Sequence, residues 1–246
     1  MAIDVAVLGC SGTYAGPDGA CSGYLVQAGG CRILVDCGPG TLANLQREIG
    51  LEQLDAVVVT HCHPDHWLEL PVMRNAFMYV LGRAGIPLYS TAETLSQAEV
   101  VCGSGLVPTF EPTIITDGDE LAIGPLRARF ARTQHPVETL SVRFDHDGGS
   151  VAYSADTGAD WSFSELGLGI GVGICEATSL DPAYVSGFHL TPREAGERGR
   201  QGQVQQLVLT HQLPGSDAEE FRRQGADAYG APVHIASTGA HFHHET

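Results

Sequence analysis

Residues 57–70, VVVTHCHPDHWLEL, place three histidines and an aspartate within six positions directly after a run of valines. The valine run predicts a buried strand, and the polar residues begin where that strand ends. They are His61, His63, Asp65 and His66. A strand end holds its side chains rigidly, and the loop after it allows neighbouring side chains to converge on one point. Because imidazole and carboxylate together suit zinc or a similar divalent ion, this stretch favours a metal site over a histidine-rich polar turn.

Three further ligand-type residues recur in the same setting, at the ends of apolar segments. They are His135 in ARTQHPVETL, Asp156 in VAYSADTG and His211 in QLVLTHQLPG. Taken singly, each would more often be structural: Asp156 as the start of a turn, His135 as a cap. Four strand ends that carry ligands in one chain are hard to attribute to chance. We therefore expect these residues to meet at one edge of a sheet.

The composition limits the partners of this chain. With 246 residues, 43% of them hydrophobic, the chain can bury a sizeable core. All 13 basic residues are arginine, and the formal net charge is −16. This charge disfavours large nucleic acids, whose binding needs many cations opposite phosphates. A small phosphorylated ligand is compatible, because bound metal ions supply positive charge locally.

Cysteine usage and the N-terminal segment bear on localisation. Seven cysteines, an odd number with no CxxC pair, indicate reduced thiols rather than a disulfide framework. Asp4 stands where a signal peptide has a basic residue, and the apolar run after it is short. No stretch approaches the roughly 20 apolar residues of a membrane span. We expect a cytoplasmic protein without a membrane partner.

Short apolar runs bounded by Gly, Pro or Asp predict an α/β protein. The predicted strands are 3–9, 22–28, 31–36, 55–60, 110–115, 126–132, 140–145, 151–155, 170–175, 205–210 and 232–236. The predicted helices are 39–49, about 67–84, 92–102, 191–201 and 216–227. Thr191, Pro192 and Glu194 form a capping box at one helix start. No linker or repeat interrupts this order, so we expect one domain over residues 1–246, a four-layer αββα sandwich.

The ligand-type residues resemble those of the metallo-β-lactamase superfamily. Its HxHxDH…H…D…H signature is matched by His61, His63, Asp65, His66, His135, Asp156 and His211. The resemblance extends from LGCSGTYAGPDGACSGYLV to LTHQLPG, and so covers most of the chain. It implies the four-layer fold and two divalent metal ions, zinc first, with manganese or iron as alternatives.

The resemblance also assigns the ligands. It places His61, His63 and His135 on one ion, Asp65, His66 and His211 on the other, and Asp156 between the two. Asp36, in LVDCGPG, resembles the aspartate that lies behind the ligands in this superfamily, where it would orient them.

Two further motifs indicate a branch of the superfamily. Glu176 in ICEATS and His189 in GFHLTPREAG are similar to the HEAT and HST motifs of ribonuclease Z, whose glutamate and histidine handle protons beside the metals. Cys175 and Leu190 depart from these motifs but leave the pair intact. By this resemblance His189 would protonate the leaving oxygen, and Asp65 would orient the nucleophile as well as bind metal. The alternative for Glu176 is a purely structural hydrogen bond.

The segment between His135 and Asp156 bears on the substrate. Ribonuclease Z inserts a long basic arm there to hold tRNA, whereas this chain has room only for two strands and a DHDGG turn. Three segments resemble instead the arm-less bacterial cyclic-nucleotide phosphodiesterases of this fold. They are LGCSGTYAGPDGACSGYLV near the N-terminus, HPVETLSVR and YSADTG. We therefore expect a phosphodiesterase acting on a small nucleotide, first of all cyclic AMP or cyclic GMP. Thr139 or Ser141 would contact the phosphate.

Three alternatives stay open. They are a ribonuclease Z-type tRNA 3′-processing endonuclease, an acyl hydrolase of the same fold (lactonase or thioesterase), and a non-catalytic metal- or nucleotide-binding protein. The Glu176–His189 pair favours phosphodiester chemistry over acyl transfer, and the complete ligand set disfavours a non-catalytic protein. Similar proteins are often dimers, so a homodimer is compatible. We expect the C-terminal histidines to lie in a solvated tail. They are His241, His243 and His244.

Overall fold

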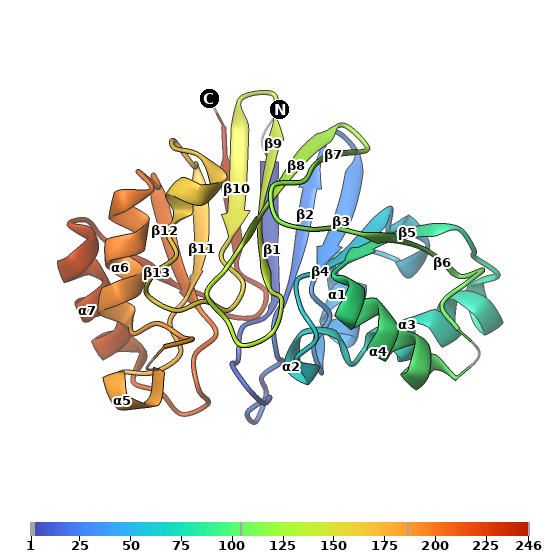
Figure 1. The fold of residues 1–246 in the computed structure, drawn as a ribbon, viewed down its shortest axis with the longest axis horizontal. Helices are drawn as coiled ribbons and strands as arrows, with labels where there is room; N and C mark the ends of the chain where they lie inside the picture. Colours follow the sequence, from blue (N-terminus) through green and yellow to red (C-terminus); the bar gives the residue numbers. More distant parts are fainter. Residues whose placement is uncertain (1–2, 104, 186, 246) are drawn as a thin grey trace.

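Two seven-stranded sheets pack face to face in the computed structural model, which describes residues 3–103, 105–185 and 187–245. The first sheet has the strand order β14-β1-β2-β3-β4-β5-β6, and the second has the order β13-β12-β11-β10-β9-β8-β7. Helices cover the outer face of each sheet, so the layers are αββα (Figure 1). The expected four-layer sandwich in a single domain is confirmed.

The elements have the following bounds. The first sheet contains β1 (Ile3–Gly9), β2 (Gly23–Ala28), β3 (Cys31–Val35), β4 (Ala56–Val59), β5 (Ile86–Ser90), β6 (Phe110–Ile114) and β14 (His241–His244). The second contains β7 (Glu120–Ile123), β8 (Leu126–Arg132), β9 (Leu140–His146), β10 (Gly149–Tyr153), β11 (Val172–Glu176), β12 (Gln206–Thr210) and β13 (His234–Ile235). The α-helices are α1 (Thr41–Glu48), α2 (Pro64–Trp67), α3 (Leu70–Asn75), α4 (Ala92–Cys102), α5 (Pro182–Val185), α6 (Pro192–Gln201) and α7 (Ala218–Tyr229). Short 3-10 turns span Leu51–Gln53 and Phe163–Leu166, and a π-helical segment spans Ala76–Leu81.

Apolar side chains fill the three spaces between the four layers. Val58 and Phe130 lie between the sheets, Trp67 lies between the first sheet and its helices, and Phe221 lies between the second sheet and its helices. Every residue of β4 is buried, so its sequence AVVV is apolar throughout. This explains why the valine run before the histidines is a reliable strand signal.

Among the described residues, three strands are not predicted by the sequence patterns: β5, β7 and β14. The last of these corrects the expectation of a C-terminal tail, because the segment is a strand, although His241 and His243 are exposed as expected. β14 pairs antiparallel with β1, so that His241 lies opposite Ala6 and His244 opposite Ile3. Phe242 between them is buried. Its side chain and the strand pairing hold the C-terminal histidines at the edge of the first sheet.

The helix expected over 67–84 is interrupted. α2 ends at Trp67 and α3 begins at Leu70, because the N–H of Glu69 donates to the carbonyl of Cys37 rather than to a helical carbonyl. Pro71 has no N–H to contribute at the start of the next helix. By contrast, the capping box expected at Thr191 is present at the start of α6.

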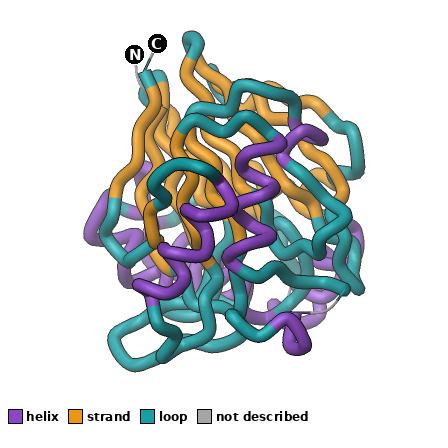
Figure 2. The backbone as a smooth tube through the Cα atoms, turned by 90° about the vertical axis from the view of Figure 1, so that its left-hand side faces the viewer, coloured by secondary structure: helices purple, strands orange, loops and turns teal. Residues whose placement is uncertain are grey.

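The two ends of the sandwich differ. The N- and C-termini lie at one end, whereas α2, α5 and long loops lie at the other (Figures 1 and 2). In both sheets one half is parallel, and in a parallel ladder all carboxyl ends lie at the same edge. The described residues contain no helix long and apolar enough to cross a membrane.

Candidate metal centre

Ligand-type side chains gather where strands of both sheets end. β4 of the first sheet leads into the loop that carries His61 and His63. In the second sheet β8 precedes His135, β10 precedes Asp156 and β12 precedes His211. The structure brings these residues together in two neighbouring groups, together with Asp65 and His66.

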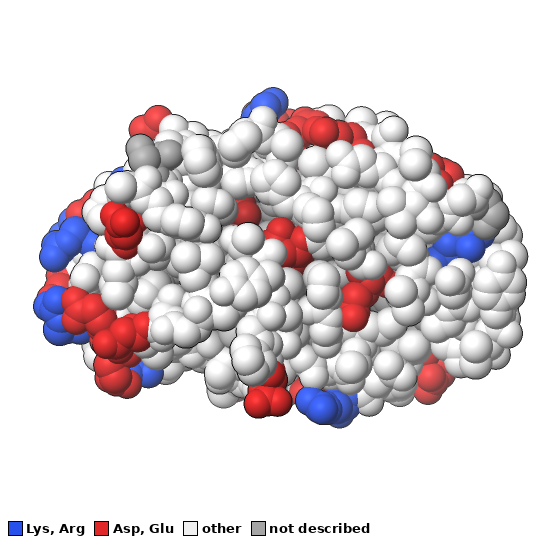
Figure 3. All heavy atoms as spheres, turned by 90° about the horizontal axis from the view of Figure 1, so that it is seen from below, with Lys and Arg blue, Asp and Glu red and all other residues white. Residues whose placement is uncertain are grey.

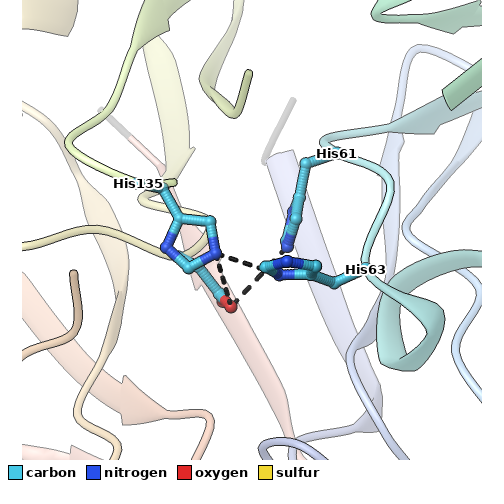
Figure 4. A group of neighbouring side chains, drawn as sticks. His61, His63 and His135 are labelled. Atoms are coloured by element: carbon cyan, nitrogen blue, oxygen red, sulfur yellow. Dashed lines mark hydrogen bonds and ion pairs between the residues drawn. The ribbon is translucent and has the colours of Figure 1, made fainter. Parts of the chain in front are cut away.

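The first group surrounds one point with four ligand atoms. His61, His63, His135 and Asp156 each offer an atom within 4.8 Å of the others. Nε2 of His135 is 3.0 Å from Nδ1 of His63. Oδ2 of Asp156 is 3.7 Å from Nε2 of His61 and 3.9 Å from Nε2 of His135. Figure 4 shows the three imidazoles converging from two different loops. Three imidazole nitrogens and a carboxylate oxygen are a zinc-type donor set.

The second group consists of Asp65, His66 and His211. Nε2 of His211 lies 3.3 Å from Oδ2 of Asp65 and 3.3 Å from Oδ1 of Asp156. Nε2 of His66 lies 3.3 Å from the same Oδ1. Asp156 therefore turns Oδ2 toward the first group and Oδ1 toward the second, which is the arrangement of a bridging carboxylate.

The donor atoms fit divalent cations. Among the described residues, Nε2 of His61, Nε2 of His66 and Oδ1 of Asp156 are buried and make no hydrogen bond, although the last two atoms lie 3.3 Å apart. Each such atom costs about 1–3 kcal/mol, so three around one space indicate a group that the protein is built to bind. Burial would lower the pKa of His66, but the charges of Asp156, Asp65 and Asp36 raise it well above its usual value. The site therefore attracts positive charge.

Asp36 holds ligands of both groups from behind. Its Oδ2 accepts hydrogen bonds from Nδ1 of His66 (2.7 Å) and Oγ1 of Thr60 (3.0 Å), and its Oδ1 accepts from the Thr60 N–H (2.8 Å). Because the Thr60 hydroxyl donates to Asp36, it accepts from Nδ1 of His61, 3.0 Å away. These bonds leave Nε2 of both histidines for a metal. Asp36 therefore lies behind the ligand groups. Thr60 directly precedes the first ligand, but no motif in the sequence indicates its part in this network.

Glu176 and His189 form a pair beside the second group. Nδ1 of His189 donates to Oε1 of the fully buried Glu176 at 2.9 Å. Burial lowers the pKa of His189, but the charge and hydrogen bond of Glu176 outweigh it and raise the pKa to about 9. Thr178, which no sequence motif indicates, donates to Oε2 of Glu176 at 2.7 Å and accepts from Nδ1 of His211 at 2.9 Å. One hydroxyl thus connects the pair to a ligand of the second group.

Comparison with known proteins agrees with this geometry. Residues 31–212 match the family model of the beta-lactamase superfamily domain. The chain belongs to the metallo-β-lactamase superfamily. An uncharacterised protein of Mycobacterium leprae is 32% identical over 98% of this chain and 89% of its own length. The probable metallo-hydrolase YhfI of Bacillus subtilis is 29% identical over 96% of this chain and 97% of its own.

Two further similarities indicate the branch within the metallo-β-lactamase superfamily. The crystal structure of YhfI superposes with a TM-score of 0.91 and 27% sequence identity, and the match covers 99% of both chains. Ribonuclease Z of Mycobacterium marinum is 28% identical over 96% of each chain. The protein is therefore a metal-dependent hydrolase of the ribonuclease Z-like branch, as its motifs predict.

A cavity of about 400 Å³ opens onto the two ligand groups. Its walls include Thr13, Asp65, Asp156, His189 and His211. The backbone N–H of Thr13 donates to Oδ2 of Asp65 at 2.8 Å, so the glycine-rich loop after β1 orients this carboxylate. One molecule bound in this cavity would therefore contact both ligand groups and His189.

Thr139 and Ser141 do not line this cavity. Both are fully buried, and their hydroxyls donate to backbone carbonyls, Thr139 to Val137 at 3.1 Å and Ser141 to Ala131 at 2.8 Å. Because each hydroxyl is directed into the protein, the expectation that these residues contact the phosphate is wrong.

The donor set predicts the metal content. Protein purified without chelator is expected to contain close to two divalent ions per chain by elemental analysis. Chelation should lower the melting temperature and re-addition should restore it, because a ligand at 100 times its Kd stabilises the native state by about 2.7 kcal/mol. A metal content near zero after reconstitution with zinc, manganese and iron would contradict the assignment.

Proposed function

We propose that this hydrolase cleaves a small phosphodiester, with 3′,5′-cyclic AMP and cyclic GMP as the first candidates. The position of the Glu176–His189 pair carries the proposal. A nitrogen of His189 lies within 4.8 Å of ligand atoms of Asp156 and His211, and His189 lines the same cavity. A phosphodiester needs positive charge beside its non-bridging oxygens and a proton for its leaving alkoxide. The residues around this cavity are suited to provide both.

Each residue then has a definite part in the reaction. Two divalent ions held by the seven ligands would supply Lewis-acid charge and lower the pKa of a water molecule. Asp65, held by Thr13, orients that water toward phosphorus. As the bond from phosphorus to the leaving oxygen breaks, His189 delivers its proton to that oxygen. Glu176 holds the imidazole ring and favours its protonated form.

The short connection between β9 and β10 in the second sheet supports the proposal of a small substrate. β9 and β10 are joined by only two residues, Asp147 and Gly148, so no arm projects between His135 and Asp156. Figure 3 views the loop end, where acidic side chains lie near the centre of the face and basic ones mostly toward its edges. A long polyanion would meet repulsion there, whereas one phosphate on two cations would not.

A substrate panel tests the proposal. Metal-loaded protein is expected to hydrolyse bis(p-nitrophenyl) phosphate and at least one cyclic nucleotide, and to leave a pre-tRNA and a lactone essentially intact at physiological salt. The Asp156→Ala variant, assayed in parallel, reports any contaminating activity. Efficient pre-tRNA processing would overturn the small substrate, and lactone hydrolysis without phosphodiester hydrolysis would overturn the reaction class.

A further inference from the structure

A second cavity, of about 290 Å³, adjoins the first. The two cavities share His189 as a common lining residue. The other polar residues of the second cavity are Gln134, Asp160 and Glu194. None of these belongs to the two ligand groups, and the hydrolytic reaction derived above does not use them.

The shared histidine indicates what the second cavity receives. If His189 gives its proton to the leaving oxygen, the atoms attached to that oxygen lie next to the imidazole ring. The phosphorus lies on the side of the two ligand groups. The remainder of the leaving group then extends to the other cavity that His189 lines.

The walls of this second cavity offer hydrogen-bond acceptors. The Gln134 side chain is held by Asp160: its Nε2 donates to Oδ2 at 2.9 Å, and its Oε1 accepts from the Asp160 N–H at 2.7 Å. Glu194 uses Oε2 for the N–H and hydroxyl of Thr191, both at 2.8 Å. Within the described part of the chain, Oδ1 of Asp160 and Oε1 of Glu194 make no hydrogen bond. Ionised carboxylates only accept, so the matching ligand carries donors.

An exposed aromatic ring beside His189 further restricts the chemical class of the ligand. Phe188 is 42% exposed and lies in the chain between Gly187 and His189, which line the second cavity, but it does not line either cavity itself. Its ring centroid lies 5.7 Å from that of His189 and 6.5 Å from that of His135. Aromatic side chains beside a nucleotide site provide stacking surfaces for bases. A planar base with N–H donors fits this combination better than an alkyl ammonium group.

We propose that the second cavity is the leaving-group subsite and that it takes a nucleobase whose N–H donors face Asp160 and Glu194. Adenine and guanine both carry an exocyclic amino group of this kind. The inference rests on the phosphodiesterase activity proposed above, and it adds the part of the substrate that determines specificity.

Substrate pairs that differ by one amino group test this subsite. Cyclic GMP and cyclic IMP differ in the 2-amino group, and cyclic AMP and the cyclic phosphate of purine riboside differ in the 6-amino group. In the wild type, kcat/KM is expected to favour the amino-bearing member of one pair by about tenfold, the effect of a good base-edge contact on a partly exposed site. The pair that shows the preference distinguishes guanine from adenine.

Two isosteric variants assign the preference to the carboxylates. In Asp160→Asn the amide oxygen still accepts from Gln134, and in Glu194→Gln the capping box at Thr191 is kept, because glutamine serves as well as glutamate. In each variant an amide NH₂ replaces the free acceptor oxygen. The preference is expected to fall toward one in at least one variant. Glu165→Gln, which removes an equal charge at an exposed position outside both cavities, should keep the wild-type preference.

The outcomes separate the two proposals. Hydrolysis of cyclic nucleotides with no amino-group preference in either pair would overturn the subsite alone. So would a wild-type preference that persists in both Asp160→Asn and Glu194→Gln. Absence of hydrolysis for every cyclic nucleotide, with both metal ions bound, would overturn the proposed function and the subsite with it.

Discussion

Replacing Asp156 with alanine is expected to lower the affinity for both metal ions and to abolish hydrolysis. Its Oδ1 faces His66 and His211, and its Oδ2 faces His61 and His135, so one substitution removes a ligand atom from each group. Changing a residue behind a ligand typically costs roughly 10–100-fold in metal affinity, and loss of the bridge should cost more. Elemental analysis and metal titration, followed by assay with bis(p-nitrophenyl) phosphate, provide the measurement.

Two further variants make this result interpretable. Asp156→Asn keeps the volume of the side chain and one carbonyl oxygen, so it should retain one ion better than the other. Asp36→Asn alters the support behind His66 but removes no ligand, and it should fall within the 10–100-fold range. Circular dichroism of each variant checks that the fold is intact. Full occupancy of both ions in Asp156→Ala, with only activity lost, would show that Asp156 is not the bridge.

Replacing His189 with alanine is expected to leave both ions bound and to slow cyclic-nucleotide hydrolysis by about 10²–10⁴-fold, the usual contribution of general acid catalysis. The ribose oxygen departs poorly as an alkoxide, so it needs the proton. A p-nitrophenolate group departs without one, so the loss should be much smaller with bis(p-nitrophenyl) phosphate. Glu176→Gln should show the same pattern more weakly, because it removes the charge that favours the protonated ring. Its amide nitrogen also replaces one of two oxygens that accept from backbone N–H groups, Oε1 from Thr157 and Oε2 from Leu190, so circular dichroism of this variant checks the fold.

The comparison of a ribose with a p-nitrophenolate leaving group distinguishes three roles for His189. His243→Ala, which changes an exposed histidine of β14 far from the cavity, should have no effect on either substrate. Equal losses with both substrates would assign His189 to phosphate binding or to the fold. Loss of a metal ion in His189→Ala would instead make it a ligand, a role that its distance to Asp156 and His211 permits.

Local sequence was sufficient for the parts of the site that lie close together in the chain. AVVV followed by THCHPDH specifies a buried strand and a loop with ligands, because strand burial and the spacing of the histidines are properties of neighbouring residues. Local patterns of the same kind predict the strands before His135, Asp156 and His211, and the capping box at Thr191. The superfamily signature then grouped residues that local patterns cannot group.

Contacts between distant segments determine the elements and side-chain directions that local sequence does not predict. β14 exists because His244 reaches Ile3 at the other end of the chain, and no local pattern in AHFHHET indicates that pairing. Ser141 alternates with Leu140 and Val142, which face the core between the sheets, so its hydroxyl turns away from the cavity.

The orientation of the two Asp156 oxygens and the formation of the second cavity also depend on contacts between segments that are distant in the sequence. Gln134 and Asp160 meet across 26 residues, and His66 meets Asp156 across the two sheets. Spacing along a chain fixes which residue types are available. The register and packing of the two sheets determine which of their atoms face each other, because those positions depend on the burial of side chains throughout the core.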